Sequence, residues 1–310
     1  MKSYKRPPFL FNAHLETIFP TLSRRVRVSQ SPERLELEDG DFLDLYWSKQ
    51  GSERLVVVLH GLEGDAHRVY IQGMIRACMQ AGFDCLTFNY RGCGEEVNRL
   101  KRFYHSGATD DVRRVMDHVG KRDYKSISMV GFSLGGNLSL KYLGEGAVLP
   151  NLSAAVAVSV PLDLLGCTLE IHKPRNFIYH DRFLRSLKEK VRRKSAHGFD
   201  FDLDLLEKID RLWDFDDHFT APLGGFAGAE DYYISCSSKN FISEIKIPTL
   251  ILNAANDPFL SETCYAPHVS TENELIKFMQ PEHGGHVGFF QKGGLYFSEW
   301  AAVSFLNSNI

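Results

Sequence analysis

The sequence lacks the features of a membrane-spanning or nucleic-acid-binding protein. No apolar run approaches the ~20 residues that a membrane-spanning helix needs, and a formal net charge of −3 argues against a nucleic-acid partner. The N-terminal segment starts basic, but Asn12, His14 and Glu16 interrupt the apolar stretch that a signal peptide requires. We therefore expect a cytoplasmic protein with no signal peptide and no nucleic-acid partner.

Internal repeats, low-complexity tracts and recognisable metal or phosphate motifs are also missing. The 6 cysteines are scattered without the close spacing of metal ligands, at positions 78, 85, 93, 167, 236 and 264. No Gly-x-x-x-x-Gly-Lys-Ser/Thr phosphate-binding loop is present. We expect reduced thiols, and we expect neither a metal nor an organic cofactor.

What the sequence does contain is an alternation of strand and helix patterns. The 310 residues, 44% of them hydrophobic, support a sizeable core and about two domain-sized units. Strands are predicted at 55–60, 83–90, 127–130, 154–160, 248–254 and 274–279, helices at 69–80, 109–119 and 135–143, and an edge hairpin at 34–47. This alternation predicts an α/β fold, with a mostly parallel central sheet and helices on both faces.

The alternation is interrupted between residues 163 and 246, where the pattern is helical and polar. We predict that 163–246 is a helical cap insertion in a core made of residues 1–162 and 247–310, with an N-terminal arm at 1–33. Because the insertion follows a parallel strand, it should lie over the carboxyl ends of the strands, where active sites of such sheets form.

A candidate nucleophile lies between the predicted strand 127–130 and the helix that follows it. Residues 131–135 read Gly-Phe-Ser-Leu-Gly, the Gly-x-Ser-x-Gly pattern of a nucleophile elbow. A serine at such a sharp turn exposes its Oγ, and the flanking glycines avoid collisions as the chain doubles back. The pattern and its context together predict that Ser133 is a catalytic nucleophile.

A base and an orienting acid are available downstream. Asp257 follows the predicted strand 248–254, and His286 follows the strand 274–279. The order Ser…Asp…His, with each group just past the end of a strand, is that of the α/β-hydrolases. Loops at the carboxyl ends of parallel strands converge, so we expect Ser133, Asp257 and His286 to form a catalytic triad.

The strand 55–60 leads into His60-Gly61-Leu62-Glu63-Gly64, a candidate oxyanion-hole loop. Acyl transfer needs two backbone N–H groups aimed at the developing oxyanion. In this layout one belongs to the residue after the nucleophile, Leu134, and we assign the other to Leu62. We interpret His60 as a brace for the loop.

The chain resembles the YheT-like branch of the α/β-hydrolases, bacterial proteins assigned as esterases and related to eukaryotic abhydrolase-domain lipases. The resemblance spans nearly the whole chain and rests on the segments 11–20, 60–64, 89–94, 131–137, 229–233, 256–259 and 283–289. It implies Ser133 as nucleophile, Asp257 as acid and His286 as base. Ala13, where proline is usual, and Asn256, where a second aspartate is common, depart from the pattern without removing a catalytic group.

Two rival residues are open to the same roles. Asp163 ends the preceding strand, a position from which some hydrolases take their acid, but Asp257 fits the chain order and the family position. His283 lies three residues before His286. The Val-Gly-Phe that follows His286 matches the family's segment after its histidine, so we prefer His286.

These features predict a serine hydrolase that cleaves carboxylic esters through an acyl-enzyme, with a small-molecule ester as substrate. We expect short or medium acyl chains, because a cap that encloses the site restricts chain length. An acyltransferase with the same triad is one alternative. A lipase or phospholipase acting at a lipid surface is another, since residues 182–194 carry seven Lys or Arg against one Glu. We favour a cap helix without membrane contact, and the oligomeric state is open.

Overall fold

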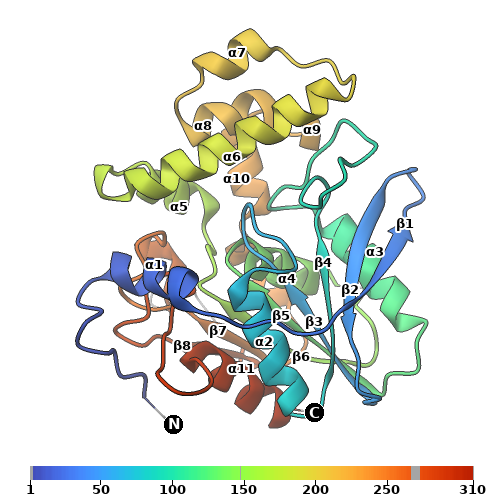
Figure 1. The fold of residues 1–310 in the computed structure, drawn as a ribbon, viewed down its shortest axis with the longest axis vertical. Helices are drawn as coiled ribbons and strands as arrows, with labels where there is room; N and C mark the ends of the chain where they lie inside the picture. Colours follow the sequence, from blue (N-terminus) through green and yellow to red (C-terminus); the bar gives the residue numbers. More distant parts are fainter. Residues whose placement is uncertain (1–2, 147, 267–272, 310) are drawn as a thin grey trace.

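The structure is a computed structural model that describes residues 3–146, 148–266 and 273–309. Its strands form one eight-stranded sheet in the order β1-β2-β4-β3-β5-β6-β7-β8 (Figure 1). The first two strands form an antiparallel hairpin at one edge, as predicted, and the other six run parallel. The strands are β1 (Ser31–Glu36), β2 (Phe42–Ser48), β3 (Arg54–Leu59), β4 (Asp84–Asn89), β5 (Ser126–Phe132), β6 (Leu152–Val158), β7 (Thr249–Leu252) and β8 (Ile276–Met279).

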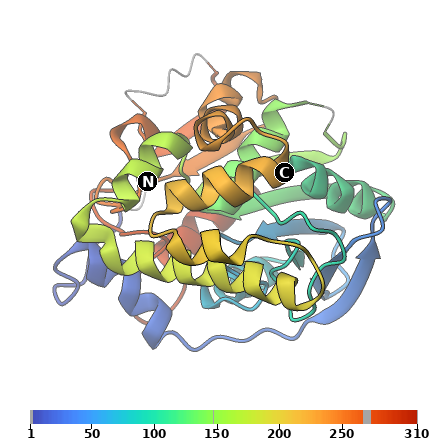
Figure 2. The ribbon, with the colours of Figure 1, turned by 90° about the horizontal axis from the view of Figure 1, so that it is seen from above.

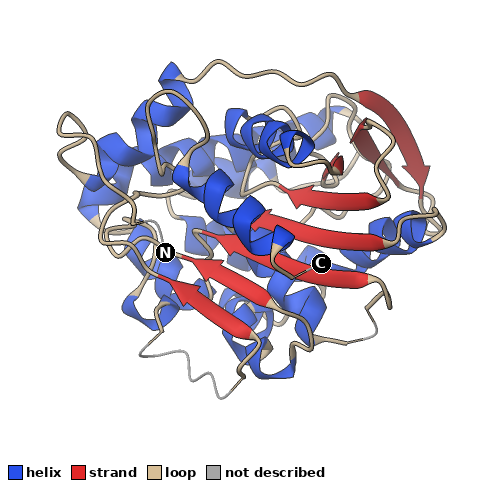
Figure 3. Ribbon diagram, turned by 90° about the horizontal axis from the view of Figure 1, so that it is seen from below, coloured by secondary structure: helices blue, strands red, loops and turns tan. Residues whose placement is uncertain are grey.

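Helices cover both faces of the parallel strands (Figure 3). α2 (Val69–Gln80) and α11 (Phe297–Asn307) pack on one face, and α3 (Thr109–Gly120) and α4 (Leu134–Gly144) pack on the other. Successive residues of β3 alternate between the two cores: Val56 and Val58 belong to one, and Leu55, Val57 and Leu59 to the other. A strand buried on both faces explains its uninterrupted apolar sequence. The predicted α/β fold, with a mostly parallel sheet and helices on both faces, is confirmed.

The chain between β6 and β7 forms the helices that lie above the carboxyl ends of the strands (Figures 1 and 2). Residues 164–236 contain no strand. Their α-helices, which we call the cap helices, are α5 (Leu164–Ile171), α6 (Phe177–Ala196), α7 (Leu203–Lys208), α8 (Leu212–Phe215), α9 (Ala221–Gly224) and α10 (Ala229–Cys236). A π-helical turn, η2 (Asp216–Thr220), joins α8 to α9, and short 3₁₀ turns lie between α5 and α6 and after α10.

The cap helices have a small core of their own, built from Leu184 and Val191 of α6 together with Leu206, Ile209 and Leu212. α1 (Ala13–Ser23) lies below α5 and α6, on the side of the sheet where β7 and β8 lie (Figure 1). Its His14 ring is 3.2 Å from the Tyr179 hydroxyl of α6. The N-terminal helix and the cap helices therefore face the same region above the strands.

Candidate active site

Ser133 occupies the sharp turn that the sequence predicts. It separates the end of β5 from the first residue of α4 and has φ 51° and ψ −121°, a conformation that costs a non-glycine residue about 1–3 kcal/mol. Glycine is required on both sides of the serine, because the chain passes too close to other backbone atoms there to leave room for a Cβ. A Cβ on Gly131 would lie 2.3 Å from the Gly135 carbonyl oxygen, and one on Gly135 would lie 2.5 Å from the His60 carbonyl oxygen. The turn thus holds the Ser133 side chain away from the core.

The structure brings Ser133, His286 and Asp257 together. The Nε2 atom of His286 lies 3.0 Å from the Ser133 Oγ. Its Nδ1 atom lies 2.9 Å from Oδ2 and 3.1 Å from Oδ1 of Asp257. Asp257 is buried, and its Oδ1 also accepts a hydrogen bond from the Phe259 N–H at 2.9 Å. These contacts have the lengths and the order expected of a nucleophile, a base and an orienting carboxylate.

The two rival residues lie outside this chain of contacts. Asp163 caps the N-terminus of α5, accepts a hydrogen bond from Thr263 at 2.7 Å and pairs with Lys239 at 2.8 Å. Burial acts to raise the pKa of Asp163, but the hydrogen bonds from Lys239 and Thr263 outweigh it and lower the pKa. His283 approaches Glu16 and Glu282, at 3.9 Å and 3.6 Å. Asp163 therefore serves as a helix cap, and His283 lies next to the acidic side chain of Glu16.

Leu62 and Leu134, the predicted oxyanion-hole residues, border the same space as Ser133. Both residues line the pocket at Ser133, and a Cβ on Gly61 would lie 3.1 Å from the Ser133 Cβ. The neighbours of Leu62 are fixed: the Gly61 N–H donates to Tyr70 and the Glu63 N–H donates to Tyr104, at 3.0 Å and 2.8 Å. Within the described residues, neither the Leu62 nor the Leu134 N–H has such a partner. Two backbone donors are thus available near the serine.

His60 braces this loop. It is fully buried, its Nδ1 lies 2.8 Å from the Gly61 carbonyl oxygen, and its own carbonyl accepts a hydrogen bond from the Tyr90 hydroxyl at 2.9 Å. Burial lowers the pKa of His60 to about 4, so the ring is neutral at pH 7. A neutral, enclosed imidazole fits a structural role.

The N-terminal helix α1 holds the loop that carries His286, which the sequence reasoning missed. The buried Glu16 accepts hydrogen bonds from the Gly284 N–H at 2.5 Å and from the Asn256 side-chain amide at 2.9 Å. The Thr17 hydroxyl accepts a hydrogen bond from the His286 N–H at 2.9 Å. The conspicuous segment 11–20 was the available signal, but its sequence does not show which loop it contacts.

The two departures from the family pattern have local explanations. Asn256 donates to Glu16 with its amide nitrogen and accepts from the Gly285 N–H with its amide oxygen, at 3.1 Å. An aspartate could not make both bonds when ionised, because a carboxylate only accepts. Ala13 is the first residue of α1, after the N-cap Asn12. Proline is favoured at that position but not required.

The basic stretch 182–194 forms part of α6, and most of it contacts other parts of the protein. Six of its seven basic side chains have partners among the described residues: Arg185 with Asp181, Lys188 and Arg192 with Glu207, Lys190 with Gly92, Arg193 with Glu95, and Lys194 with Leu100. Lys194 is only 1% exposed, and burial lowers its pKa to about 8. Much of the stretch therefore anchors α6 to the loop at 92–100.

Two cavities meet at Ser133 and His286. The first, which we call the inner pocket, has a volume of about 110 Å³ and extends beneath the cap helices, with Phe183, Leu187 and Leu212 in its wall. The second, the outer pocket, has a volume of about 200 Å³ and extends towards α1, with Leu22 and Arg182 in its lining. A substrate bound at Ser133 therefore has space on both sides of the reacting bond.

Two further properties concern cofactors and membranes. Across residues 3–146, 148–266 and 273–309, no three His, Cys, Asp or Glu side chains gather in a way that could hold a metal ion. The same described segments contain no helix that is both long and apolar enough to cross a membrane.

The fold and the geometry at Ser133 define an α/β-hydrolase, and comparison with known proteins agrees. Residues 54–293 match the family model described as "alpha/beta hydrolase fold", and the chain belongs to this family. It is 37% identical over 288 residues to "Putative esterase YheT" of Escherichia coli (strain K12), covering 90% of this chain and 84% of that protein. It is 27% identical over 285 residues to "Phospholipase ABHD3" of Mus musculus, covering 88% and 69%.

Solved structures show the same fold. The Pyrococcus furiosus esterase Pf2001 superposes with a TM-score of 0.60 at 16% identity, covering 91% of this chain and 93% of that one. The family match and the 37% identity to YheT confirm the predicted resemblance to the YheT-like α/β-hydrolases. The protein is a hydrolase of the esterase or lipase type.

Proposed function

We propose that the protein is a serine esterase that cleaves carboxylic esters of short or medium acyl chains. The observation that carries the proposal is the continuous hydrogen-bonded arrangement from the Ser133 Oγ through both nitrogens of His286 to Asp257, located where two pockets meet. A structural serine would need neither the strained turn nor a buried carboxylate behind the histidine. The arrangement instead has the parts of an activated nucleophile.

In the proposed mechanism, the Ser133 Oγ attacks the ester carbonyl carbon while His286 Nε2 takes the hydroxyl proton. The Leu62 and Leu134 N–H groups donate to the resulting oxyanion, and each such donor is worth about 10²–10³ in rate. The tetrahedral intermediate then expels the alcohol, which receives the proton from His286. Water, deprotonated by His286, attacks the acyl-enzyme and releases the acid. Asp257 holds the imidazole in the required tautomer and stabilises the imidazolium that forms.

The two pockets suggest how an ester is divided between them. We place the acyl group in the inner pocket, which is enclosed by the cap helices and largely apolar next to Ser133, and the alcohol in the outer pocket. The inner volume of about 110 Å³ lies below the roughly 300–1,000 Å³ of pockets for drug-sized ligands. This supports a limited acyl length.

One observation favours a second candidate, an enzyme that acts at a lipid surface. Leu22 in the outer pocket is 68% exposed, and Phe177 and Ile178 at the start of α6 are 65% and 66% exposed. Exposed apolar side chains of this size can insert into a lipid interface. The partners of the basic side chains of α6 support the first candidate, because those charges are already engaged within the protein.

The experiment that tests the proposal is a series of p-nitrophenyl esters from acetate to palmitate, with and without alcohol acceptors. The proposal expects hydrolysis with kcat/KM highest for short or medium chains. Acyl transfer to the alcohol in preference to water would make the protein an acyltransferase. Activity that increases with chain length and increases again on anionic vesicles, and that falls in a Phe177→Ser and Ile178→Ser double variant, would establish the second candidate.

A further inference from the structure

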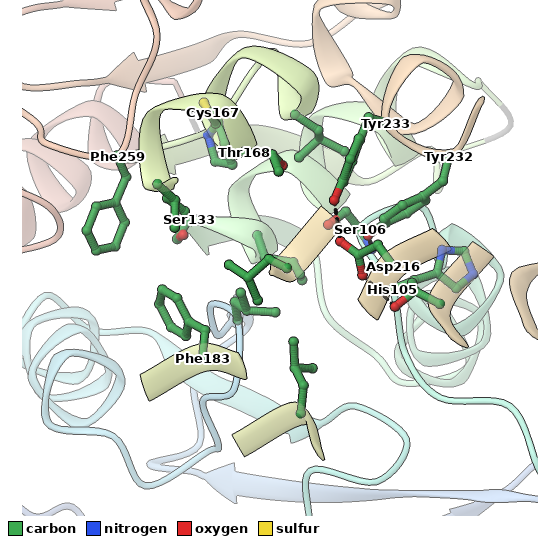
Figure 4. A pocket seen from close by; sticks show the side chains of 18 of the residues that line it. His105, Ser106, Ser133, Cys167, Thr168, Phe183, Asp216, Tyr232, Tyr233 and Phe259 are labelled. Atoms are coloured by element: carbon green, nitrogen blue, oxygen red, sulfur yellow. Dashed lines mark hydrogen bonds between the residues drawn. The ribbon is translucent and has the colours of Figure 1, made fainter. Parts of the chain in front are cut away.

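The inner pocket ends in polar side chains that a plain acyl chain would not use. In Figure 4, Ser133 and Phe259 lie at one side of the pocket, and Asp216, Tyr232, Tyr233, His105 and Ser106 lie at the other. The wall of the same pocket also contains Leu164, Phe183, Leu187 and Leu212. An acyl chain that leaves Ser133 along this apolar wall therefore meets a polar end.

Asp216 is the group whose position is hardest to explain by packing alone. Its Oδ2 accepts a hydrogen bond from the Tyr233 hydroxyl at 2.6 Å, and its Oδ1 accepts one from the Thr220 hydroxyl at 2.5 Å. Burial raises the pKa of Asp216 to about 6, although the bonds from Thr220 and Tyr233 oppose the rise. At pH 7 the carboxyl is thus mostly ionised in a largely apolar pocket, which is unfavourable for a charge without a counter-ion.

The surrounding titratable groups do not supply that counter-ion. Burial lowers the pKa of His105 to about 4, so its ring is neutral at pH 7. Burial also raises the pKa values of Tyr232 and Tyr233 well above the ordinary value, so both keep their protons. Within the described residues, no Lys, Arg or His forms an ion pair with Asp216. The pocket end is therefore a site of negative potential bordered by neutral groups.

The backbone at Asp216 is also unusual. Residues Asp216–Thr220 form a π-helical turn, in which the Ala221 N–H donates to the Asp216 carbonyl oxygen. Such turns are rare and frequently occur at functional sites. Here the turn brings Thr220 and Asp216 into contact at the pocket end. The π-helical turn is a second observation, independent of charge, that distinguishes the end of the inner pocket from ordinary helix packing.

We propose that the end of the inner pocket binds a hydrogen-bond donor, a hydroxyl or an ammonium group, at the far end of the substrate's acyl chain, with Asp216 as the acceptor. The inference rests on the proposed function, in which the acyl chain occupies the inner pocket. It narrows the substrate class to esters of hydroxy or amino acids whose donor is remote from the carbonyl. A purely structural Asp216, tying α10 to η2 through Tyr233, is the competing explanation.

The test compares p-nitrophenyl esters that differ only at the end of the acyl chain. Hexanoate, 6-hydroxyhexanoate and 6-aminohexanoate are matched in length, with four- and eight-carbon sets to find the best length. The quantity measured is the ratio of kcat/KM for the donor ester to that for the plain ester, which a loss of stability does not change. A hydrogen bond to a charged group should give a ratio of ~10 or more at the best length.

Three variants separate a binding role from a structural one. Asp216→Leu should bring both ratios near one. Asp216→Asn should abolish the preference for the ammonium ester and keep part of the preference for the hydroxyl ester, since an amide oxygen still accepts a hydrogen bond. The matched control is Asp204→Asn, which changes an exposed carboxyl of the cap helices and should leave both ratios unchanged. Ratios near one in the wild type at every length, or ratios that survive Asp216→Leu, would overturn the inference.

The experiment distinguishes failure of the esterase proposal from failure of the inference about Asp216. If the wild type cleaves none of the esters, the esterase proposal fails, and the inference is decided by binding to Ser133→Ala. Calorimetry with hexanamide and 6-hydroxyhexanamide then compares the two amides directly. Tighter binding of the hydroxylated amide, lost in Ser133→Ala with Asp216→Leu, supports the inference. Equal binding of the two amides overturns it.

Discussion

Glu16 and Asn256 are 240 positions apart in the chain, and their side chains form a hydrogen bond of 2.9 Å. Each also holds the loop before His286: Glu16 accepts from the Gly284 N–H, and Asn256 accepts from the Gly285 N–H. The base is thus positioned by a helix near the N-terminus and by the loop that carries Asp257. The orientation of His286 depends on segments from both ends of the chain.

Glu16→Ala should therefore reduce catalysis without touching the reacting atoms. Loss of the buried acceptor leaves the Gly284 N–H unsatisfied and lets the histidine loop shift, and a displacement of about 1 Å can cost on the order of 10² in rate. We expect kcat to fall much more than KM rises. The control is Glu282→Ala, which removes an exposed carboxyl from the same loop region. A variant with lower stability but an unchanged kcat for its folded fraction would limit Glu16 to a structural role.

Asp257→Asn should reduce kcat by about 10⁴, because an amide favours the wrong tautomer of His286. Asp163→Asn is the matched comparison, since Asp163 has the alternative acid position but contacts Lys239 and Thr263 instead of the histidine. Its effect should appear in thermal stability more than in kcat. Steady-state kinetics of both variants on one ester decide the matter, and a reversed order of effects would move the acid to Asp163.

Asp216 should make the free energy of unfolding depend on pH. Its pKa rises from 3.8 to about 6 on folding because of burial. Between these two pH values the Asp216 carboxyl is protonated in the folded state and ionised in the unfolded state. The resulting stabilisation is present below about pH 4 and is lost as the pH rises through about 6. One pKa unit corresponds to about 1.4 kcal/mol, so the loss is on the order of 2–3 kcal/mol.

Urea unfolding of the wild type and Asp216→Asn at a series of pH values measures this effect. Relative to the variant, the wild type should lose free energy of unfolding between about pH 4 and pH 6 and then level off. A constant difference between the two proteins across this range would show that Asp216 keeps an ordinary pKa in the folded state.

The dependence of kcat/KM on the length of the acyl chain should show where the inner pocket ends. Among plain esters, kcat/KM should be highest for a short or medium chain and fall steeply beyond it, because longer chains cannot be enclosed beneath the cap helices. Leu212→Ala, which shortens a side chain in the pocket wall, should move the optimum to longer chains. Leu203→Ala, at an exposed position of the cap helices, is the control. An optimum that stays in place in Leu212→Ala would argue against the inner pocket as the acyl site.

Much of the fold follows from local sequence patterns. Continuous apolar runs such as 55–59 show strands buried on both faces, and the Gly-x-Ser-x-Gly turn places Ser133 at the end of one of them. Parallel strands then bring their following loops together, so Asp257 and His286 could be expected near Ser133. The contacts observed among the three are consistent with that reasoning.

The contacts around the triad and at the end of the inner pocket could not be predicted from the sequence in the same way. Glu16 looks like a surface residue of an amphipathic helix, and its burial depends on a loop more than 260 positions away. Asp216 lies in a stretch whose spacing predicts helix packing, and the π-helical turn that begins at Asp216 has no sequence signature. Long-range packing determines the position of Glu16, and a turn with one extra residue contains Asp216.

The proposed ester cleavage requires Ser133 to be an activated nucleophile. A fluorophosphonate probe reacts with a serine hydroxyl only when an adjacent base assists it, and mass spectrometry of the labelled protein locates the adduct. We expect one adduct, on Ser133, that is absent from Ser133→Ala and forms far more slowly in Asp257→Asn. An adduct on another serine, or ester hydrolysis undiminished in Ser133→Ala, would contradict this proposal.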